Sequence, residues 1–317
     1  MKLQDLKIIA GNSNPELAQE IVSNLDKKLT EASVDRFPDG EIHVHIQETV
    51  RGASVFVVQS ISPPVNENLV ELLLIIDALK RASAKQIAAV IPYYGYARQD
   101  RKQTGRVPIS AKLVANIIST AGADRILTVD LHAGQIQGFF DIPVDNLRGD
   151  PVLANNLTDE VSSEGGVVVS PDVGGAKRAR KVSQKLNLPL AIVEKKRDRQ
   201  DGGVKVLNLI GEVESKRCLI VDDIISTAGT LTEVAEILAE RGASHIEAIC
   251  THGIFAEDAL EYIEESPINS VTVTNTIKNS DAEKVDFINH ISMGDLFART
   301  IKRIYEEKSV STLFPHS

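Results

Sequence analysis

The fold is decided by the stretch Cys218-Leu-Ile-Val-Asp222-Asp223-Ile-Ile-Ser226-Thr227-Ala228-Gly229-Thr230, which opens into an amphipathic pattern over 230–241. Its apolar start predicts a buried strand with two carboxylates at the carboxyl end, where open α/β sheets bind their ligands. The small and hydroxyl residues then lead into a helix amino terminus, whose N–H groups suit a phosphate. We therefore expect the carboxylates to face sugar hydroxyls and the loop to hold the sugar's phosphate. The alternative is a strand that ends in Asp, followed by an ordinary Ser/Thr helix cap.

Strand and helix patterns alternate through the rest of the chain. Apolar, β-branched runs predict strands at 6–10, 54–59, 86–91, 125–130, 166–170, 190–194, 217–222, 245–251 and 270–274. Helical patterns lie between them at 66–81, 109–120, 176–186 and 230–241. This alternation indicates βαβ units with largely parallel sheets, and the continuously apolar strands indicate helices on both faces. The pattern pauses near 147–151, which predicts two domains, 1–148 and 149–317. Two stretches, 92–108 and 195–205, show no clear element.

Composition excludes several classes of protein. The formal charge of −9, from 35 basic and 44 acidic residues among 317, argues against general nucleic-acid binding. The most apolar segment, 69–79, contains Glu71 and Asp77, so no membrane span is expected. The amino terminus lacks a long enough apolar run for a signal sequence. Cys218 and Cys250 each lie in an apolar stretch, which predicts buried thiols and a reducing compartment, the cytoplasm.

Further motifs carry charged and polar residues in patterns that suit phosphates. They are Phe37-Pro-Asp39-Gly-Glu41, Tyr96-Ala-Arg98-Gln99-Asp100, Asp130-Leu-His132-Ala-Gly-Gln-Ile-Gln-Gly138-Phe-Phe, Ser170-Pro-Asp172-Val-Gly-Gly-Ala-Lys177-Arg178 and Lys195-Lys196-Arg197-Asp198-Arg199. Arg98 and Gln99 place a guanidinium and an amide beside a Tyr-rich turn, which suits bidentate contact with phosphate. Asp172 follows an apolar strand, and one carboxylate is enough for Mg²⁺, which keeps waters and substrate phosphates as its other ligands. The sequence contains neither a Walker A motif nor Gly-x-Gly-x-x-Gly.

Each of these motifs also has a structural interpretation when taken alone. Phe37 would be a core residue, with Asp39-Gly as a turn. Arg98 would belong to a solvated surface loop, and His132 would be a satisfied group at a strand end. The cations from Lys195 to Arg199 would form a solvated hairpin tip.

Together, the motifs resemble those of ribose-phosphate pyrophosphokinases (phosphoribosyl pyrophosphate synthetases) of the phosphate-activated class, which are related to type I phosphoribosyltransferases. The resemblance runs nearly from end to end. It implies an α/β fold of two similar type I phosphoribosyltransferase-like domains, each a mainly parallel sheet flanked by helices, with the last residues packing back on the first domain. It also implies that ATP and D-ribose 5-phosphate give 5-phospho-α-D-ribose 1-diphosphate and AMP, which feeds nucleotide, histidine and tryptophan biosynthesis.

The resemblance assigns site residues in both domains. The first domain carries the ATP-binding motifs, with the residues Phe37, Asp39, Glu41, Arg98, Gln99 and His132. The second carries the ribose 5-phosphate site, with the residues Arg197, Asp222, Asp223, Ser226, Thr227, Ala228, Gly229 and Thr230. Lys195 and Arg197 are implied as the catalytic pair, on a loop that closes over the phosphates. His132 and Asp172 are implied as the residues that help hold Mg²⁺.

Assembly and regulation also follow from the resemblance. It implies a homo-oligomer, a hexamer built from dimers, in which Phe37, Asp39 and Glu41 complete the ATP site of a neighbouring subunit. It implies an allosteric pocket where inorganic phosphate activates and ADP inhibits, formed by Thr49, Arg51, Ser83, Arg106, Ser309 and Ser311. The alternative for these six residues is scattered surface polarity.

One residue departs from the family pattern. Ser226 stands where the family usually carries Asp, so the chain lacks a carboxylate near the ribose. Two other functions stay open on the sequence alone: a type I phosphoribosyltransferase, which would share the Asp222–Thr230 motif, and a non-catalytic regulatory relative of the synthetase.

Overall fold

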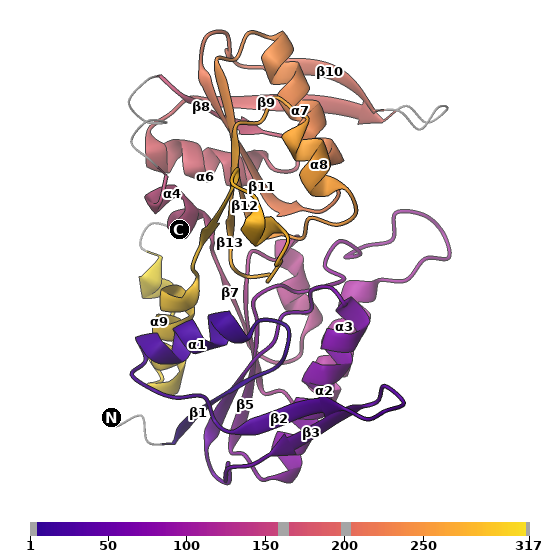
Figure 1. Cartoon of the computed structure of the whole chain (residues 1–317), viewed down its shortest axis with the longest axis vertical. Helices are drawn as coiled ribbons and strands as arrows, with labels where there is room; N and C mark the ends of the chain where they lie inside the picture. The colour runs from indigo at the N-terminus through magenta and orange to yellow at the C-terminus, as the bar shows by residue number, and fades with distance from the viewer. Residues whose placement is uncertain (1–4, 158–164, 198–203, 315–317) are drawn as a thin grey trace. The chain divides into compact units, whose positions relative to one another are not determined.

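The structure is a computed structural model that describes residues 5–157, 165–197 and 204–314, with the main chain alone described at 195–197 and 204–207. The chain divides into two compact units (Figure 1). The first comprises Met1–Arg148, Thr276–Lys278 and Ser292–Ser317, and the second Gly149–Asn275 and Asn279–Ile291. Helix α9 (Gly294–Tyr305), near the carboxyl terminus, thus belongs to the first unit.

A five-stranded parallel sheet forms the centre of the first unit, in the order β1-β4-β5-β6-β7. Its strands are β1 (Leu6–Ala10), β4 (Ser54–Val58), β5 (Gln86–Ile91), β6 (Arg125–Val129) and β7 (Val144–Leu147). Helices α2 (Val65–Arg81) and α3 (Ser110–Ala121) cover one face, while α1 (Pro15–Asn24) packs with α9 on the other (Figure 1). Both faces are therefore buried, as the continuously apolar strands predict.

The second unit is built around a seven-stranded sheet in the order β10-β9-β8-β11-β12-β13-β14, in which, among the described strands, β10 alone is antiparallel to its neighbour. Its strands are β8 (Val167–Ser170), β9 (Leu190–Arg197), β10 (Val204–Ile210), β11 (Arg217–Ile225), β12 (His245–Gly253), β13 (Ser270–Thr274) and β14 (Ile288–Ile291). Helices α7 (Gly229–Glu240) and α8 (Ala259–Glu264) cover one face, and α4 (Asp150–Asn155) and α6 (Ala176–Leu186) the other. Two units with mainly parallel sheets between helices confirm the predicted α/β fold class.

Other expectations from the sequence are met among the described residues. Cys218 and Cys250 are buried free thiols on β11 and β12. Residues 92–108 form neither helix nor strand. Within the described part of the chain, every helix is too short or too polar to cross a membrane.

The prediction that 195–205 lacks a clear element is wrong. Strand β9 continues to Arg197 and β10 begins at Val204, with Lys195 paired to Val206 and Arg197 to Val204. A ladder of main-chain hydrogen bonds at a sheet edge does not need apolar side chains, so the run of cations does not end the strand. Residues 198–203, which include the predicted loop tip, lie outside the described residues.

A hairpin that the sequence patterns did not predict projects from the first unit. Strands β2 (Ala32–Arg36) and β3 (Ile42–Ile46) pair antiparallel, and residues 37–41 form the tip between them (Figure 1). The alternation of Ile42-His-Val-His-Ile is the period-two signal of a half-buried strand and could have revealed it.

Candidate functional site

The two carboxylates lie at the carboxyl end of β11, as the sequence predicts. Asp223 is buried and Asp222 half-buried. Arg178 on α6 donates to Asp223 Oδ1 over 3.0 Å and lies 3.6 Å from Asp222 Oδ1. The main-chain N–H of Asp223 donates to Asp222 Oδ1 over 2.8 Å. A guanidinium and a main-chain donor thus hold the acidic pair in one orientation.

Burial and mutual repulsion shape the electrostatics of this pair. Desolvation raises the pKa of Asp222, the negative charge of Asp223 raises it further, and Arg178 lowers it, which leaves it at about 7. One proton shared near neutral pH relieves the repulsion of two adjacent carboxylates. A bound cation or hydroxyl donors from a sugar would do the same.

The loop after β11 leads into α7 at the same edge of the sheet. Ala228, with φ of 62° and ψ of −8°, occupies the position before the helix, and its carbonyl accepts from the N–H of Thr232 over 2.9 Å. Neither Ser226 nor Thr227 stands at that cap position, so the alternative of an ordinary Ser/Thr cap is wrong. Alanine offers no side-chain acceptor there, and the amino terminus of α7 suits an external phosphate.

Asp172 lies at the same edge of the second unit, in the turn between β8 and α6. Its Oδ1 accepts from the N–H of Gly175 over 2.7 Å, and its carbonyl accepts from the Ser170 hydroxyl over 2.7 Å. The residue is exposed. Because β8 is the parallel neighbour of β11, Asp172 and Asp222 follow adjacent strand ends.

Lys195 and Arg197 lie on the extended part of β9, which runs parallel to β8 on its other side. Strand β9 therefore reaches beyond the edge that carries Asp172 and Asp222. The structure describes only the main chain at Lys195 and Arg197, so the orientation of their side chains stays a prediction.

In the first unit, the Arg98 motif and the His132 motif meet. Gln135 Nε2 donates to Asp100 Oδ2 over 2.6 Å, which joins the loop after β5 to helix η1 (Gly134–Phe139) after β6. The N–H of Gln99 donates to the Tyr96 carbonyl over 3.1 Å, and the Gln99 carbonyl accepts from Ala111 at the start of α3 over 3.2 Å. Arg98, Gln99 and His132 are exposed at this junction.

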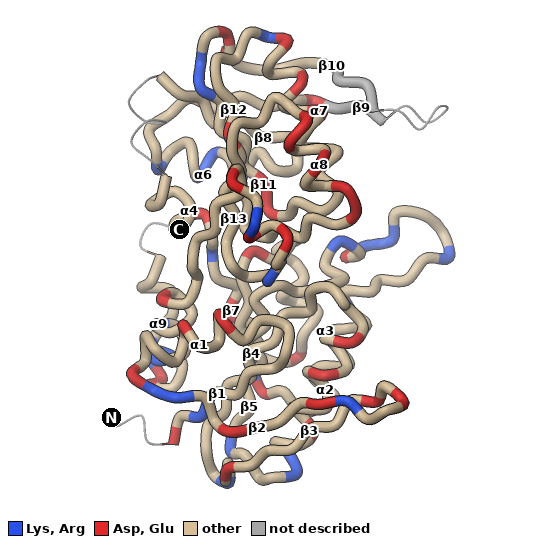
Figure 2. Tube along the Cα trace, in the orientation of Figure 1, with Lys and Arg blue, Asp and Glu red and all other residues tan. Residues whose placement is uncertain are grey.

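Basic residues gather along the same loop. Figure 2 shows blue segments on the projecting loop that connects β5 to α3 along the chain, and the sequence has four cations in the nine residues 98–106. Such a concentration of positive charge in an acidic protein is the local patch that a polyanionic ligand needs.

The residues Phe37, Asp39 and Glu41 lie at the tip of the hairpin β2–β3, and all three are exposed. Phe37 is 48% exposed, with its ring 5.0 Å from that of His43, so the interpretation of Phe37 as a core residue is wrong. Asp39 Oδ1 accepts from the N–H of Glu41 over 3.1 Å, and Gly40 turns the chain with φ of 94°. The Asp39-Gly turn is confirmed.

The residues predicted to form an allosteric pocket all lie in the first unit, in separate places along it. The Gly52 N–H, next to Arg51, donates to the Ser83 carbonyl over 3.0 Å. The hydroxyls of Ser309 and Ser311 lie 2.7 Å apart. Among the described contacts, none joins these two pairs to each other, or to Thr49 or Arg106.

Two features escaped the sequence analysis. Arg178 was quoted within a motif but given no role, because nothing in its spacing shows that α6 brings it against β11. The Gln135–Asp100 contact likewise joins residues 35 positions apart.

The donors available for Mg²⁺ fit that ion in part. Among the described residues, no three Asp, Glu, His or Cys side chains lie close enough together to hold a metal ion by themselves. Mg²⁺ commonly takes only one or two carboxylates and completes its shell with water and substrate phosphates, so the exposed Asp172 is a suitable ligand. His132 belongs to the first unit and Asp172 to the second, and imidazole suits so hard an ion better through water.

Known proteins resemble the chain over its whole length. Residues 6–122 match the family model of the N-terminal domain of ribose phosphate pyrophosphokinase, and residues 203–315 match that of the phosphoribosyl synthetase-associated domain. Ribose-phosphate pyrophosphokinases of Caldanaerobacter subterraneus subsp. tengcongensis and Thermotoga maritima are each 54% identical to the chain, over 309 and 313 residues, with 98% of each protein covered. The crystal structure of phosphoribosylpyrophosphate synthetase from Mycobacterium smegmatis is similar with a TM-score of 0.90 and 41% identity, covering 96% of this chain and all of that one. The resemblance predicted from the motifs is thus confirmed, and the chain belongs to the ribose-phosphate pyrophosphokinase family.

Proposed function

We propose that the protein transfers the β,γ-diphosphate of ATP to the anomeric hydroxyl of ribose 5-phosphate, which gives 5-phospho-α-D-ribose 1-diphosphate and AMP. The observation that carries the proposal is the Asp222–Asp223 pair at the end of β11, beside a helix amino terminus that has no side-chain cap. Full-length relatives named ribose-phosphate pyrophosphokinase support it at 54% identity.

The ribose 5-phosphate would bind at the edge of the second sheet. Asp222 and Asp223 accept hydrogen bonds from the ribose hydroxyls, while the 226–230 loop and the start of α7 hold the 5-phosphate. Arg178 keeps both carboxylates facing this edge. The anomeric hydroxyl is then fixed for attack on the β-phosphorus, with inversion there and departure of AMP.

Charged residues would stabilise the transferring group. The transition states of such transfers are loose, so positioning and charge stabilisation dominate. Arg98 and Gln99 hold the ATP phosphates with His132, and Lys195 and Arg197 gather charge on the diphosphate. Mg²⁺ bound at Asp172, with His132 acting through water, would supply neutralisation of the phosphates. No general base is assigned.

The proposal also covers the compartment, assembly and regulation of the enzyme. The enzyme would act in the cytoplasm as a homo-oligomer, a hexamer built from dimers, with Phe37, Asp39 and Glu41 completing a neighbour's ATP site. Inorganic phosphate would activate it and ADP inhibit it at the pocket that includes Arg51 and Ser311.

A coupled assay of AMP release tests the function. With ATP, Mg²⁺ and ribose 5-phosphate, we expect AMP and the diphosphorylated sugar in equal amounts, and neither when ribose 5-phosphate is omitted. A type I phosphoribosyltransferase would instead consume the diphosphorylated sugar together with a base and release pyrophosphate. A regulatory relative would release no AMP, and either result would refute the proposal.

A further inference from the structure

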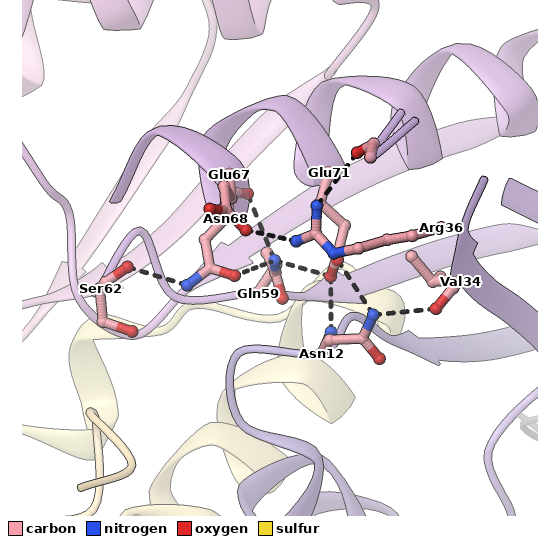
Figure 3. A network of polar contacts seen from close by, with 9 residues as sticks. Asn12, Val34, Arg36, Gln59, Ser62, Glu67, Asn68 and Glu71 are labelled. Atoms are coloured by element: carbon pink, nitrogen blue, oxygen red, sulfur yellow. Dashed lines mark hydrogen bonds and ion pairs between the residues drawn. The ribbon is translucent and has the colours of Figure 1, made fainter. Parts of the chain in front are cut away.

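A polar network fills the edge of the first unit's sheet where β1 and β4 end (Figure 3). Glu71 of α2 is only 3% exposed, and its carboxylate accepts three hydrogen bonds. The Asn12 N–H donates over 2.6 Å, Asn12 Nδ2 over 3.0 Å and Gln59 Nε2 over 2.9 Å. Asn68, also buried, accepts from Gln59 through its carbonyl over 3.2 Å. The buried carboxylate is therefore satisfied by donors of the chain itself.

Around Gly11, between the ends of β1 and β4, this edge is tightly packed. In the second unit the corresponding kind of edge carries the exposed Asp172 and the half-buried Asp222, but here the chain occupies it. A Cβ built on Gly11 would lie 2.2 Å from Gln59 Oε1 and 2.8 Å from Glu71 Oε1. The centre of the network is therefore tightly packed around Gly11, while Asn12 is exposed at its margin and contacts a second element.

The polar network around Glu71 supports the hairpin β2–β3. Asn12 Nδ2, held by Glu71, also donates to the Val34 carbonyl on β2 over 3.0 Å (Figure 3). A second link runs from Arg36, at the end of β2, to Glu67. Glu67 and Glu71 are one turn apart on α2, so one face of this helix anchors the hairpin twice.

The hairpin needs such anchors because its tip is far from its base. Val34 and Val44 pack on the core, whereas the tip residues are exposed. From Val34, where Asn12 holds β2, to Phe37 at the tip is three residues, or about 10 Å, so a tilt of about 10° there moves the tip by about 2 Å. A misplacement of even about 1 Å can cost up to a hundredfold in rate.

We propose that Asn12, held by the buried Glu71, is a positioning residue that fixes the hairpin β2–β3 so that its tip meets the adenosine of ATP. The inference rests on the proposed function, in which Phe37, Asp39 and Glu41 contact ATP. Asn12 acts through the hairpin and does not touch the nucleotide.

The test is Asn12→Ala in the full-length enzyme. We expect KM for ATP to rise about tenfold, KM for ribose 5-phosphate to change less than about twofold, and kcat at saturating ATP to stay within about threefold. Deuterium uptake of peptides over 32–46 should rise, while that of peptides over α1 should not. The matched control is Asn24→Ala, which removes an exposed amide that donates to the Glu20 carbonyl over 2.9 Å. It should change neither KM for ATP nor the deuterium uptake of peptides over 32–46.

Asn12→Asp, which keeps the size but replaces the donating nitrogen by an oxygen, should raise KM for ATP at least as much as Asn12→Ala. Asn24→Asp controls for the added charge. An unchanged KM for ATP in Asn12→Ala would overturn the inference. A raised KM without faster exchange in 32–46 would also overturn it, because Asn12 would then touch the nucleotide directly. A wild type that releases no AMP would instead refute the proposed function, and the hairpin's role in ATP binding with it.

Discussion

Asp222 is the residue whose surroundings most constrain the site. Its carboxylate is half-buried beside Asp223 and near Arg178, so ionisation of Asp222 is unfavourable until the pH approaches neutrality. Hydroxyl donors or a cation bound at the site would stabilise the ionised form. Ser226, four positions later, provides a hydroxyl where a third carboxylate would add to this repulsion.

Replacing Asp222 with Asn should change how stability depends on pH. The pKa of Asp222 is raised in the folded protein to about 7, so its contribution to stability is full below the unfolded value, near 4, and is lost as the pH rises to about 7. Relative to wild type, Asp222→Asn should therefore gain stability between pH 5 and pH 8, by an amount on the order of 2 kcal/mol. Urea unfolding without substrates measures it. Asp281→Asn is the exposed control, and parallel curves for wild type and Asp222→Asn would contradict the prediction.

Ser226→Asp should bind ribose 5-phosphate at least as tightly as wild type does. A carboxylate accepts stronger hydrogen bonds from sugar hydroxyls than a serine hydroxyl does. Its repulsion with Asp222 and Asp223 should lower the thermal midpoint of the substrate-free protein. Initial rates against ribose 5-phosphate give KM. A clear rise in that KM, with KM for ATP unchanged, would mean that Ser226 belongs to a different local arrangement.

At the scale of elements, three parallel strand ends and one helix start build the edge of the sheet where we propose that ribose 5-phosphate binds. Strands β9, β8 and β11 are consecutive in the sheet, so Asp172 after β8 and Asp222 on β11 lie at neighbouring strand ends although they are 50 positions apart in the sequence. Helix α7 begins beside them at Gly229. The main chain places Lys195 on the extension of β9 beyond this edge.

Lys195→Ala should lower kcat about 10²- to 10³-fold, as the loss of one transition-state donor typically does, with KM values within about threefold. The thermal midpoint should not change, because the pairing of Lys195 with Val206 runs through the main chain. Steady-state kinetics and thermal unfolding measure both. Lys284→Ala, which removes an exposed ion pair with Asp281, is the control. A variant that keeps more than about half of the wild-type kcat would exclude this role for Lys195.

At the scale of the whole molecule, exposed residues point to assembly. Phe37 presents a 48% exposed ring at a hairpin tip, where a neighbouring chain could cover it. Of the residues predicted for phosphate binding, the described contacts join the neighbourhood of Arg51 to Ser83 and Ser309 to Ser311, and a neighbouring subunit is one way to complete the pocket.

Two inactive variants should complement each other. An Asp39→Ala, Glu41→Ala double variant lacks the tip, and Lys195→Ala lacks the catalytic cation. If each site takes its tip from a neighbour, a hybrid pair contains one intact site. Random exchange in an equal mixture should then restore up to about a quarter of the wild-type activity. The measurement is AMP release after subunit exchange is verified by mass spectrometry. No recovery after verified exchange would show that each subunit supplies its own tip.

Phosphate should activate the enzyme, and ADP inhibition should weaken as phosphate rises, beyond what competition with ATP explains. Arg51→Ala and Ser311→Ala should blunt both responses and leave maximal activity at saturating Mg²⁺ largely unchanged. Velocity against phosphate concentration, at fixed substrates, measures this for all three proteins. A wild type that shows no phosphate dependence after rigorous phosphate removal would eliminate the pocket.

Strong periodicity made most elements predictable. The strands at 6–10, 86–91 and 270–274 and the helix at 176–186 have the predicted bounds. Helix α1 was missed although Asn14, whose Oδ1 accepts from the N–H of Leu17 over 3.1 Å, and Pro15 mark its start. The extension of β9 was missed because charged side chains hid a strand that is held through its main chain.

The sequence by itself determined the fold class, the family and the Asp222–Thr230 site, because these depend on local patterns: apolar strands, adjacent carboxylates and small residues before a helix. Tertiary structure alone decided which distant residues meet. It brought Arg178 to Asp223, Gln135 to Asp100, Glu71 to Asn12, and Asn12 to the middle of β2. It also put Phe37 into solvent. Such contacts depend on how strands and helices pack, and residues 35 to 59 positions apart carry no local signal that they will touch.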